Sequence, residues 1–416
     1  MLLNKERALA MMKENNLSAL IATQPENVTY MTDYENWWLP GAYPYRGITL
    51  NRGFQNYAML TPEGARGLVI HGLSEATQFT NFHFDVDDIY IYGTSFTRIP
   101  DSYAPQPEEV ARWIALYRNE EIHTLDAVSA LIKLMKKHGV TKGRVGIELA
   151  NLAPNAEETL REEFKQIEFI DCGELLAFIR YIKTPDELAR LRYAAEVNER
   201  ALEEMMKAIR PGVTELQMRK LYRSFVAKED GWLDFFTCAG GMRAGIWAAP
   251  TNYAFKLGDQ VLIDVGCGVN CYHGDTGICG CLGEPSKEQR ELWNGLNEVW
   301  NAGVSILRPG TRPSQLFDAM AGMQKKMFNH VGGYFSHSIG IEAREGPFAN
   351  RVPGKGQRMM DIGADHPYEP GMVILIEIPT PVVGIGGVHR EETFLITEKG
   401  HEPLIHTSRD LYCFGT

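Results

Sequence analysis

The sequence predicts two domains, an α/β domain over residues 1–175 and a larger domain of helices and strands over residues 176–416. The chain has 416 residues, of which 44% are hydrophobic, so it can bury two sizeable cores. Strand-like and helical segments alternate as far as about residue 175, which is typical of α/β folds. Beyond that point one order of elements occurs twice, which indicates internal two-fold pseudosymmetry.

The first domain begins with a predicted amphipathic helix at residues 4–15, where charged residues interrupt the apolar ones at helical spacing. This segment is therefore not expected to be a signal peptide. An apolar run at residues 17–22 predicts a buried strand. Further strands are predicted at residues 48–50, 57–60, 67–70, 89–92, 144–149 and 167–171, and further helices at residues 108–117 and 127–138.

The second domain contains a repeated helix stop. The residues Arg-Pro-Gly end a predicted helix at positions 210–212 and again at positions 308–310. A capping signal opens the helix before each copy, at Thr184 and at Ser286, and another helix follows each copy, at residues 215–227 and 315–329. Because the order of elements matches on both sides of this common motif, we favour duplication over chance and expect a functional centre between the two halves.

The net charge and the cysteines limit the classes of partner and compartment. A net charge of −11 repels nucleic acid and anionic membranes, so neither is expected as a partner. No segment reaches 18 uninterrupted apolar residues, so no transmembrane helix is predicted. The seven cysteines, an odd number, are expected to be reduced thiols in a cytoplasmic protein. Four of them cluster between residues 267 and 281, but their spacing matches no common zinc motif, so packing is the better interpretation.

Three acidic residues lie on predicted apolar strands of the second domain. Asp264 lies within residues 261–266 and Glu377 within residues 373–378, while Glu391 heads a third strand. Buried carboxylates in proteins are normally paired or bound to a metal. Three of them in one domain therefore predict a shared cation.

Asp275 and His337 complete the predicted site. Glycine and asparagine residues after Asp264 favour a hairpin that brings Asp275 beside it, and His337 follows a pair of glycines. A single histidine is more often structural, but this one joins four carboxylates. The ligand set suits Mn(II), Fe(II), Co(II) or Zn(II), and its charge can compensate two divalent ions about 3.5–4 Å apart, which would activate water as a nucleophile.

These motifs resemble those of the pita-bread enzymes, which include prolidase, aminopeptidase P, methionine aminopeptidase and creatinase. The resemblance covers about residues 176–416, and the first domain is similar to the amino-terminal domain of prolidase and creatinase. It rests on Val-Leu-Ile-Asp264-Val-Gly, Asp275-Thr-Gly, His337-Ser-Ile-Gly, Pro-Gly-Met-Val-Ile-Leu-Ile-Glu377 and Glu391-Glu-Thr-Phe-Leu-Ile-Thr. The resemblance implies an α+β pita-bread catalytic domain behind a creatinase-type α/β domain, metal ligands at these five positions, and a homodimer.

Two positions depart from the peptidases of this family. Those peptidases carry one histidine upstream of the first aspartate ligand and another after the metal histidine, where this chain has Trp247 and Arg344. The replacements argue against an ordinary Xaa-Pro peptidase. Arg344 instead resembles a creatinase arginine that receives a substrate carboxylate, for which a guanidinium is well suited. The alternative is an exposed arginine paired with Glu342 or Glu345. Trp247, Arg344 and Glu392 are the candidate catalytic residues.

An aromatic segment of the first domain is a second candidate for substrate binding. Trp37, Trp38, Tyr45 and Arg46 are predicted to contact substrate together with Arg344, because aromatic residues gathered outside a strand often mark a binding surface. In the relatives this region reaches the active site of the partner subunit. The alternative is a local apolar cluster.

Three functions remain open from the sequence. The first is metal-dependent hydrolysis of a C–N bond in a small molecule that bears a carboxylate, such as a dipeptide, an amide or a guanidino compound. The second is a metal-dependent lyase, because the dimethylsulfoniopropionate lyase resembles this chain in its metal ligands and in a tryptophan near position 247. The third is a non-catalytic binding protein of the same fold, against which the intact set of ligands argues.

Overall fold

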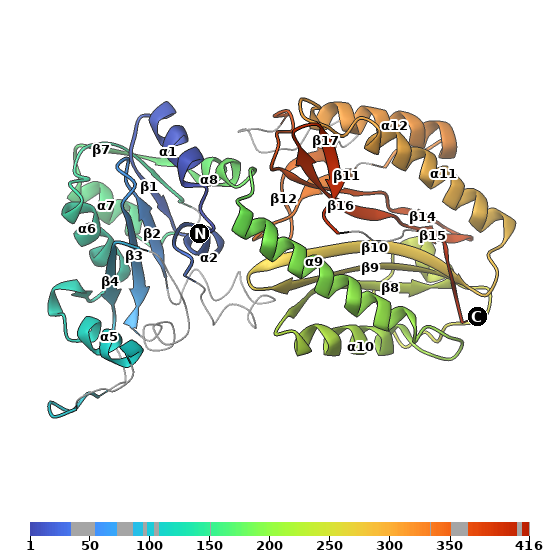
Figure 1. The fold of residues 1–416 in the computed structure, drawn as a ribbon, viewed down its shortest axis with the longest axis horizontal. Coiled ribbons are helices and arrows are strands. Elements are labelled where there is room, and N and C mark those ends of the chain that lie inside the picture. Colours follow the sequence, from blue (N-terminus) through green and yellow to red (C-terminus); the bar gives the residue numbers. More distant parts are fainter. Residues whose placement is uncertain are drawn as a thin grey trace. The chain divides into compact units, whose positions relative to one another are not determined.

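The structure is a computed structural model, and it describes residues 1–34, 55–72, 86–94, 98–103, 108–149, 151–332, 334–350, 365–405 and 410–415. The chain divides into two compact units, Met1–Arg180 and Tyr181–Thr416 (Figure 1). The boundary predicted at residue 175 falls inside the helix α8 (Gly173–Ile179). This helix contacts α1 (Lys5–Glu14), and Arg7 Nε donates a hydrogen bond to the carbonyl oxygen of Phe178 at 3.3 Å, so α8 belongs to the first unit. Among the described helices none is long and apolar enough to cross a membrane.

The first unit is built on one mixed seven-stranded sheet in the order β5-β4-β3-β2-β1-β6-β7. The strands β1 and β3 pair antiparallel with β2, and the remaining neighbours are parallel. Its strands are β1 (Leu17–Ala22), β2 (Tyr57–Leu60), β3 (Arg66–His71), β4 (Asp88–Tyr92), β5 (His123–Thr124), β6 (Gly143–Ile147) and β7 (Ile167–Asp171). The predicted strand at residues 48–50 lies outside the described residues.

Helices cover this sheet and enclose a core of buried aliphatic and aromatic side chains. They are α1, α2 (Pro25–Thr32), α5 (Glu108–Tyr117), η2 (Glu120–Ile122), α6 (Ala127–Lys137), α7 (Ala156–Glu163) and α8. The sequence pattern did not predict α2, α7 or α8. In α2 every residue after the first is buried, so the helix has no polar face and none of the periodicity that marks a helix at the surface.

The second unit consists of two halves, each of which begins with two helices that are followed by strands. The first half contains α9 (Pro185–Met206), α10 (Glu215–Lys228), β8 (Trp232–Gly240), η3 (Gly241–Ile246), β9 (Gln260–Val269) and β10 (Tyr272–Leu282). The second half contains α11 (Lys287–Val304), α12 (Pro313–Phe328), β11 (Tyr334–Ser338), β12 (Glu345–Asn350), β13 (Val373–Glu377), β14 (Thr380–Val382), β15 (Gly386–Val388), β16 (Glu391–Thr397), β17 (Gly400–Pro403) and β18 (Tyr412–Phe414).

The repeated Arg-Pro-Gly stop has the same hydrogen bonds in both halves. The backbone N–H of Gly212 donates to the carbonyl of Phe255, and that of Gly310 donates to the carbonyl of Tyr368, both at 2.9 Å. Both glycines have a left-handed φ, +87° and +88°, which an L side chain rarely adopts. The two loops therefore turn in the same way and are each anchored on a buried aromatic residue, as a duplication predicts.

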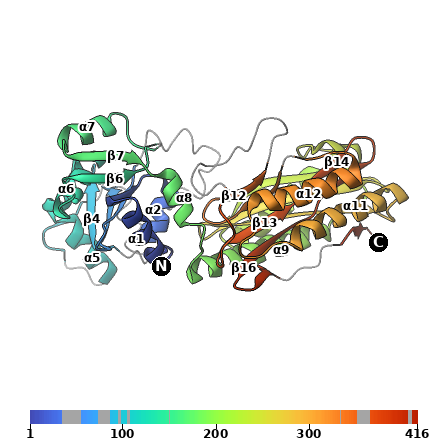
Figure 2. The same cartoon turned by 90° about the horizontal axis from the view of Figure 1, so that it is seen from above.

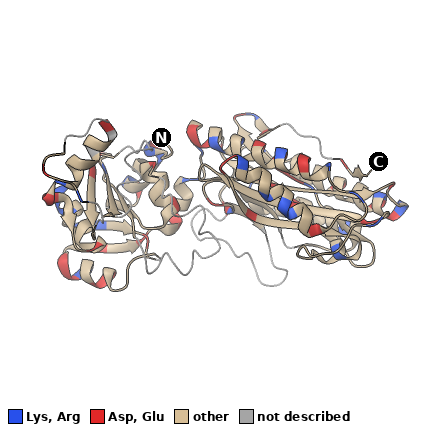
Figure 3. Cartoon of the chain, turned by 90° about the horizontal axis from the view of Figure 1, so that it is seen from below, with Lys and Arg blue, Asp and Glu red and all other residues tan. Residues whose placement is uncertain are grey.

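The strands of the second unit form a four-stranded sheet, β18-β10-β9-β8, a five-stranded sheet, β12-β11-β13-β16-β17, and the ribbon β14-β15. The helices α9 and α10 pack on the first sheet, and α12 packs on the second (Figure 1). The two sheets meet where β10 contacts β16. The ribbon lies at the opposite end of this unit from β12 (Figure 2). On the outside, basic and acidic residues are interspersed along the helices (Figure 3).

Candidate metal centre

Asp264 and Asp275 lie on the same face of the first sheet. In the antiparallel pair β9–β10, Asp264 is opposite Gly277 and Asp275 is opposite Gly266, so the two aspartates are diagonal neighbours. The helix α9 covers the other face, where Asn198 Nδ2 donates to the carbonyl of Val265 at 3.3 Å. The hairpin predicted from the turn residues after Asp264 is present and brings the aspartates together.

His337, Glu377 and Glu391 share one face of the second sheet. Glu377 on β13 is directly opposite Glu391 on β16, and His337 on β11 is opposite Leu375, two residues before Glu377. Because side chains alternate along a strand, all three point to the same side. The contact between β10 and β16 joins this face to that of the two aspartates.

The five predicted ligands converge in space, although they come from five strands. His337 Nε2 lies 3.5 Å from Glu377 Oε1 and 3.8 Å from Asp275 Oδ2. Ligand atoms of Asp275, His337 and Glu391 all lie within 4.8 Å of one another, as do those of Asp264, Glu391 and a sixth residue, His389. Glu391 belongs to both groups, so its carboxylate lies between two candidate ion positions.

The electrostatics of this cluster are those of an anionic site. Burial raises the pKa of Asp264, Asp275 and Glu391 well above the ordinary values, and the charges of the neighbouring carboxylates raise them further. Burial also raises the pKa of Glu377, to about 7. The nearby charge of Arg344 lowers all four pKa values. Four buried carboxylates this close cannot all ionise at neutral pH unless a cation accompanies them.

The polar atoms of the cluster fit divalent metal ions. Among the described residues, Asp275 Oδ1 and Glu377 Oε1 are buried and have no hydrogen-bond partner. Such atoms are costly in a folded protein unless something binds them. His337 is a neutral donor because burial lowers its pKa to about 4, and its Nδ1 lies 2.7 Å from the carbonyl oxygen of Ser338, which orients Nε2 toward the carboxylates. Oxygen-rich ligands with imidazole suit Mn(II), Fe(II), Co(II) or Zn(II).

His389 is the site residue that the sequence reasoning missed. It is fully buried two residues before Glu391, with Nε2 at 3.9 Å from Glu391 Oε2 and 4.0 Å from Glu377 Oε2. Burial lowers its pKa to about 3, so it is neutral. His389 lies between β15 and β16 rather than on a strand, so strand alternation offered no signal for it.

Arg344 lies on the turn between β11 and β12 and is exposed, yet its charge acts on the four buried carboxylates. Its neighbour Glu345 is buried, and Lys183 Nζ donates to Glu345 Oε2 at 2.5 Å. Glu345 thus accepts a hydrogen bond from Lys183, and Arg344 is an exposed residue whose charge acts on the cluster. This arrangement favours a role for Arg344 toward a molecule that enters the site.

Trp247 lies beside the cluster at the end of η3. Its ring centre is 5.0 Å from that of His389, with the two planes inclined by 56°. Its backbone has a left-handed φ of +52°, which is uncommon for a bulky residue and often marks a functional position. Trp247 therefore packs against an imidazole of the cluster.

Glu392 points to the opposite face of β16 from Glu391. Arg390 Nη2 donates to Glu392 Oε1 at 3.1 Å, and Arg390 Nη1 donates to Asn297 Oδ1 on α11 at 2.7 Å. The guanidinium also lies 4.3 Å from the ring centre of Trp300 on the same helix. This placement favours a structural role for Glu392, which ties β16 to α11.

Aromatic rings lie over glycines on the face of the first sheet that carries the aspartates. A Cβ at Gly266 would lie 2.3 Å from Phe235 Cε1, and one at Gly268 would lie 2.1 Å from Trp232 Cζ2. Only glycine leaves room for these rings. Phe235 and Trp232 are partly buried and form an apolar wall along the sheet from Asp264.

Other predicted features lie outside the centre or outside the described residues. The predicted substrate-binding residues Trp37, Trp38, Tyr45 and Arg46 are not among the described residues. The seven cysteines, all described, form no disulfide.

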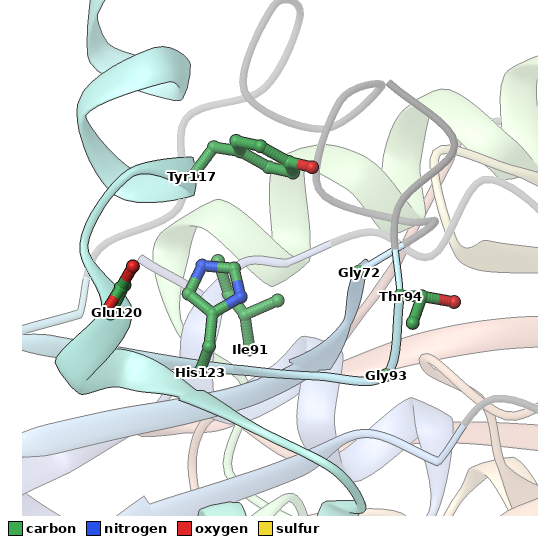
Figure 4. Close-up of a pocket in the computed structure, with 7 residues that line it drawn as sticks. All are labelled: Gly72, Ile91, Gly93, Thr94, Tyr117, Glu120 and His123. Carbon is green, nitrogen blue, oxygen red and sulfur yellow. The ribbon is translucent and has the colours of Figure 1, made fainter. Parts of the chain in front are cut away.

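The first unit has a hollow of about 380 Å³ lined by Gly72, Ile91, Gly93, Thr94, Tyr117, Glu120 and His123 (Figure 4). The rings of Tyr117 and His123 meet edge to face, and His123 Nε2 lies 3.3 Å from the carbonyl oxygen of Leu116. These lining residues bring together one imidazole and one carboxylate, a much poorer ligand set than that of the second unit.

Comparison with known proteins gives matches over both units. The model of metallopeptidase family M24 matches residues 189–398, and that of the creatinase/prolidase N-terminal domain matches residues 5–182. The chain is 28% identical over 275 residues to the Xaa-Pro dipeptidase of Pyrococcus furiosus, and this match covers 64% of this chain and 75% of the relative. It is also 28% identical over 254 residues to methionine aminopeptidase 1 of Bacillus subtilis, and this match covers 53% of this chain and 97% of the relative.

Solved structures share the fold of the whole chain. The Xaa-Pro dipeptidase from Bacillus anthracis superposes with a TM-score of 0.73 at 20% identity, covering 99% of each chain. The prolidase from Pyrococcus furiosus superposes with a TM-score of 0.68 at 20% identity, covering 96% of this chain and 100% of the other.

Proposed function

This chain belongs to metallopeptidase family M24, and we propose that it hydrolyses a C–N bond in a small molecule that bears a carboxylate. Membership makes it a metal-dependent hydrolase, with a pita-bread catalytic domain behind a creatinase-type domain. The relatives named Xaa-Pro dipeptidase suggest dipeptides as one substrate class. Trp247 and Arg344 distinguish this chain from an ordinary member of that class.

The proposed ligands are Asp264, Asp275, His337, Glu377 and Glu391, which together would hold two ions of Mn, Fe, Co or Zn. Bound ions at such a centre polarise the scissile bond and lower the pKa of water. The protein's part is to hold the ligands rigidly on strands of two sheets and to exclude solvent, since all five side chains are buried.

The observation that carries the proposal is the position of Arg344. The residue is exposed, and its charge acts on the four carboxylates of the centre. If Arg344 binds the carboxylate of the substrate, the adjoining C–N bond would point toward the metal centre, and the orientation of the substrate would be fixed. The wall of Phe235 and Trp232 fills space along the same sheet face, which favours a small substrate.

The main test is a screen of the metal-loaded protein against dipeptides, amides and guanidino compounds, each with and without a free carboxylate. We expect turnover only of compounds that retain the carboxylate. Equal turnover of the matching carboxamides would contradict the proposed substrate class.

A lyase that uses the same ligands is the second candidate, favoured by Trp247 beside the centre. Running the reaction in heavy-oxygen water separates the two, because hydrolysis places the label in the product and elimination does not. The third alternative is a non-catalytic binding protein, and the convergence of five ligands argues against it because binding alone does not require them.

We also propose that the protein is a homodimer. Met242, Ile246, Val383 and Ile385 are apolar and 62%, 62%, 72% and 39% exposed, and they lie on η3 and at the tip of the β14–β15 ribbon, which contact each other. Contiguous exposed apolar residues are typical of an interface between subunits. Sedimentation over a range of concentrations tests this, and Ile246→Glu should weaken the dimer. Cell fractionation tests the predicted cytoplasmic location.

A further inference from the structure

We propose that His389 is a sixth metal ligand, so that each of the two ions receives one imidazole, from His337 and from His389. The inference rests on the proposed metal centre and adds a ligand to it. The two groups that can hold an ion are Asp275–His337–Glu391 and Asp264–His389–Glu391. One histidine belongs to each group, and the carboxylate of Glu391 belongs to both.

The distances between the side-chain atoms are short enough for His389 and its neighbours to share an ion. Two ligand atoms that each lie about 2.0–2.2 Å from one ion are at most about 4.4 Å apart. His389 Nε2 lies 3.9 Å from Glu391 Oε2 and 4.0 Å from Glu377 Oε2, within that limit. The other oxygen of Glu377, Oε1, lies 3.5 Å from His337 Nε2. The two oxygens of Glu377 therefore face different imidazoles.

The fold provides a fitted place for the His389 ring. Gly277 is opposite Asp264 on the sheet, and a Cβ at Gly277 would lie 2.1 Å from His389 Cε1. The absence of a side chain at position 277 is what lets the imidazole lie against the sheet among the carboxylates. On another side the ring packs on Trp247, with ring centres 5.0 Å apart.

The ring nitrogens of His389 are available to bind an ion. Its side chain is fully buried, and its ring lies close to the backbone of Ile263, but neither ring nitrogen makes a hydrogen bond of good geometry among the described residues. Buried histidines in proteins are normally hydrogen-bonded or metal-bound. Nε2 faces two carboxylates at distances too long for a hydrogen bond but short enough for all three groups to coordinate one ion.

A second imidazole would change the preference of the centre among metals. Nitrogen ligands favour zinc, cobalt and iron over manganese and magnesium. A centre with one imidazole on each ion should therefore bind two Zn(II) or Co(II) ions with more similar affinities than a centre in which one ion has oxygen ligands alone.

X-ray absorption spectroscopy of the zinc-loaded full-length protein tests the proposal directly, because scattering from imidazole rings counts the histidine ligands. We expect one imidazole per zinc ion on average in the wild type and half an imidazole per ion in His389→Phe. The phenylalanine keeps the ring that fills the space between Gly277 and Trp247. Calorimetric titration of the metal-free proteins with Co(II) should show affinity for one of the two ions reduced at least about tenfold in the variant.

The control is His401→Phe, which changes a partly buried histidine outside the centre, where the ring packs 5.1 Å from Phe394. It should keep both affinities. Two zinc ions with half an imidazole each in the wild type would overturn the sixth ligand and leave the proposed function intact, and this measurement does not depend on the variant folding. A folded wild type that binds no transition metal would overturn both.

Discussion

Replacing Arg344 by methionine tests how the site recognises its substrate. Methionine keeps the length of the side chain and removes the charge and the paired donors. A charge-assisted hydrogen bond is worth roughly 1.5–3 kcal/mol, which corresponds to a factor of about 10–100 in affinity. We therefore expect the KM of a carboxylate-bearing substrate to rise at least about tenfold in Arg344→Met. Arg344→Lys, which keeps the charge without the planar geometry, should give an intermediate value.

The metal content of the variant separates this role from a structural one. The charge of Arg344 lowers the pKa of all four carboxylates, and the same positive charge repels a bound cation. The two effects oppose each other, so Arg344→Met should keep the metal content of the wild type while its KM rises.

If Arg344 were only a surface ion-pair partner, its loss would cost at most about 1 kcal/mol of stability and leave the kinetics normal. Steady-state kinetics and elemental analysis of both variants provide the measurement, with Arg210→Met, at an exposed arginine after α9, as the matched control. A KM within twofold of the wild type at full metal content would refute the proposed carboxylate clamp.

Four further predictions follow from the same structure. Asp264→Asn and Glu377→Gln should each lose metal and activity together, and wild-type metal content in both would disprove the ligand assignment. Turnover of Gly-Pro should fall below the usual enzyme range of about 1–10³ per second, so a rate inside that range would contradict the non-standard substrate. Gly277→Ala should displace His389 and destabilise the protein by about 1–3 kcal/mol in urea denaturation, whereas an unchanged midpoint would show that the ring has room to move. Burial raises the pKa of Glu187 to about 7, so the folded metal-free protein holds this proton more tightly than the unfolded chain and becomes less stable as the pH rises from 4.5 through 7. Glu187→Gln has no such proton to lose and should be more stable than the wild type at pH 8. Equal dependence of stability on pH in the two proteins would exclude this effect.

The helices and strands that the sequence predicted are those with a clear surface periodicity or capping signal. The helix after Thr184 has both hydrogen bonds of a capping box, and α10 and α12 end within a few residues of the predicted positions. The pattern failed for α2 because that helix is buried all round. Local signals predict elements well only where water contacts one face of them.

The sequence by itself identified the carboxylates of the candidate centre and His337 but not His389, because a buried acid on an apolar strand needs a cation or another partner. Asp264 and Glu377 were identifiable on that ground alone. Tertiary structure alone decided the relation among them. It placed Glu377 opposite Glu391, turned Glu392 to the other face, and seated His389 over Gly277.

Those relations depend on the register between strands far apart in the chain. A shift of one residue would send each side chain to the opposite face, and no local pattern specifies such a register. His389 follows an ordinary Gly-Gly-Val segment, and its chemistry becomes visible only when β10 and β16 lie side by side.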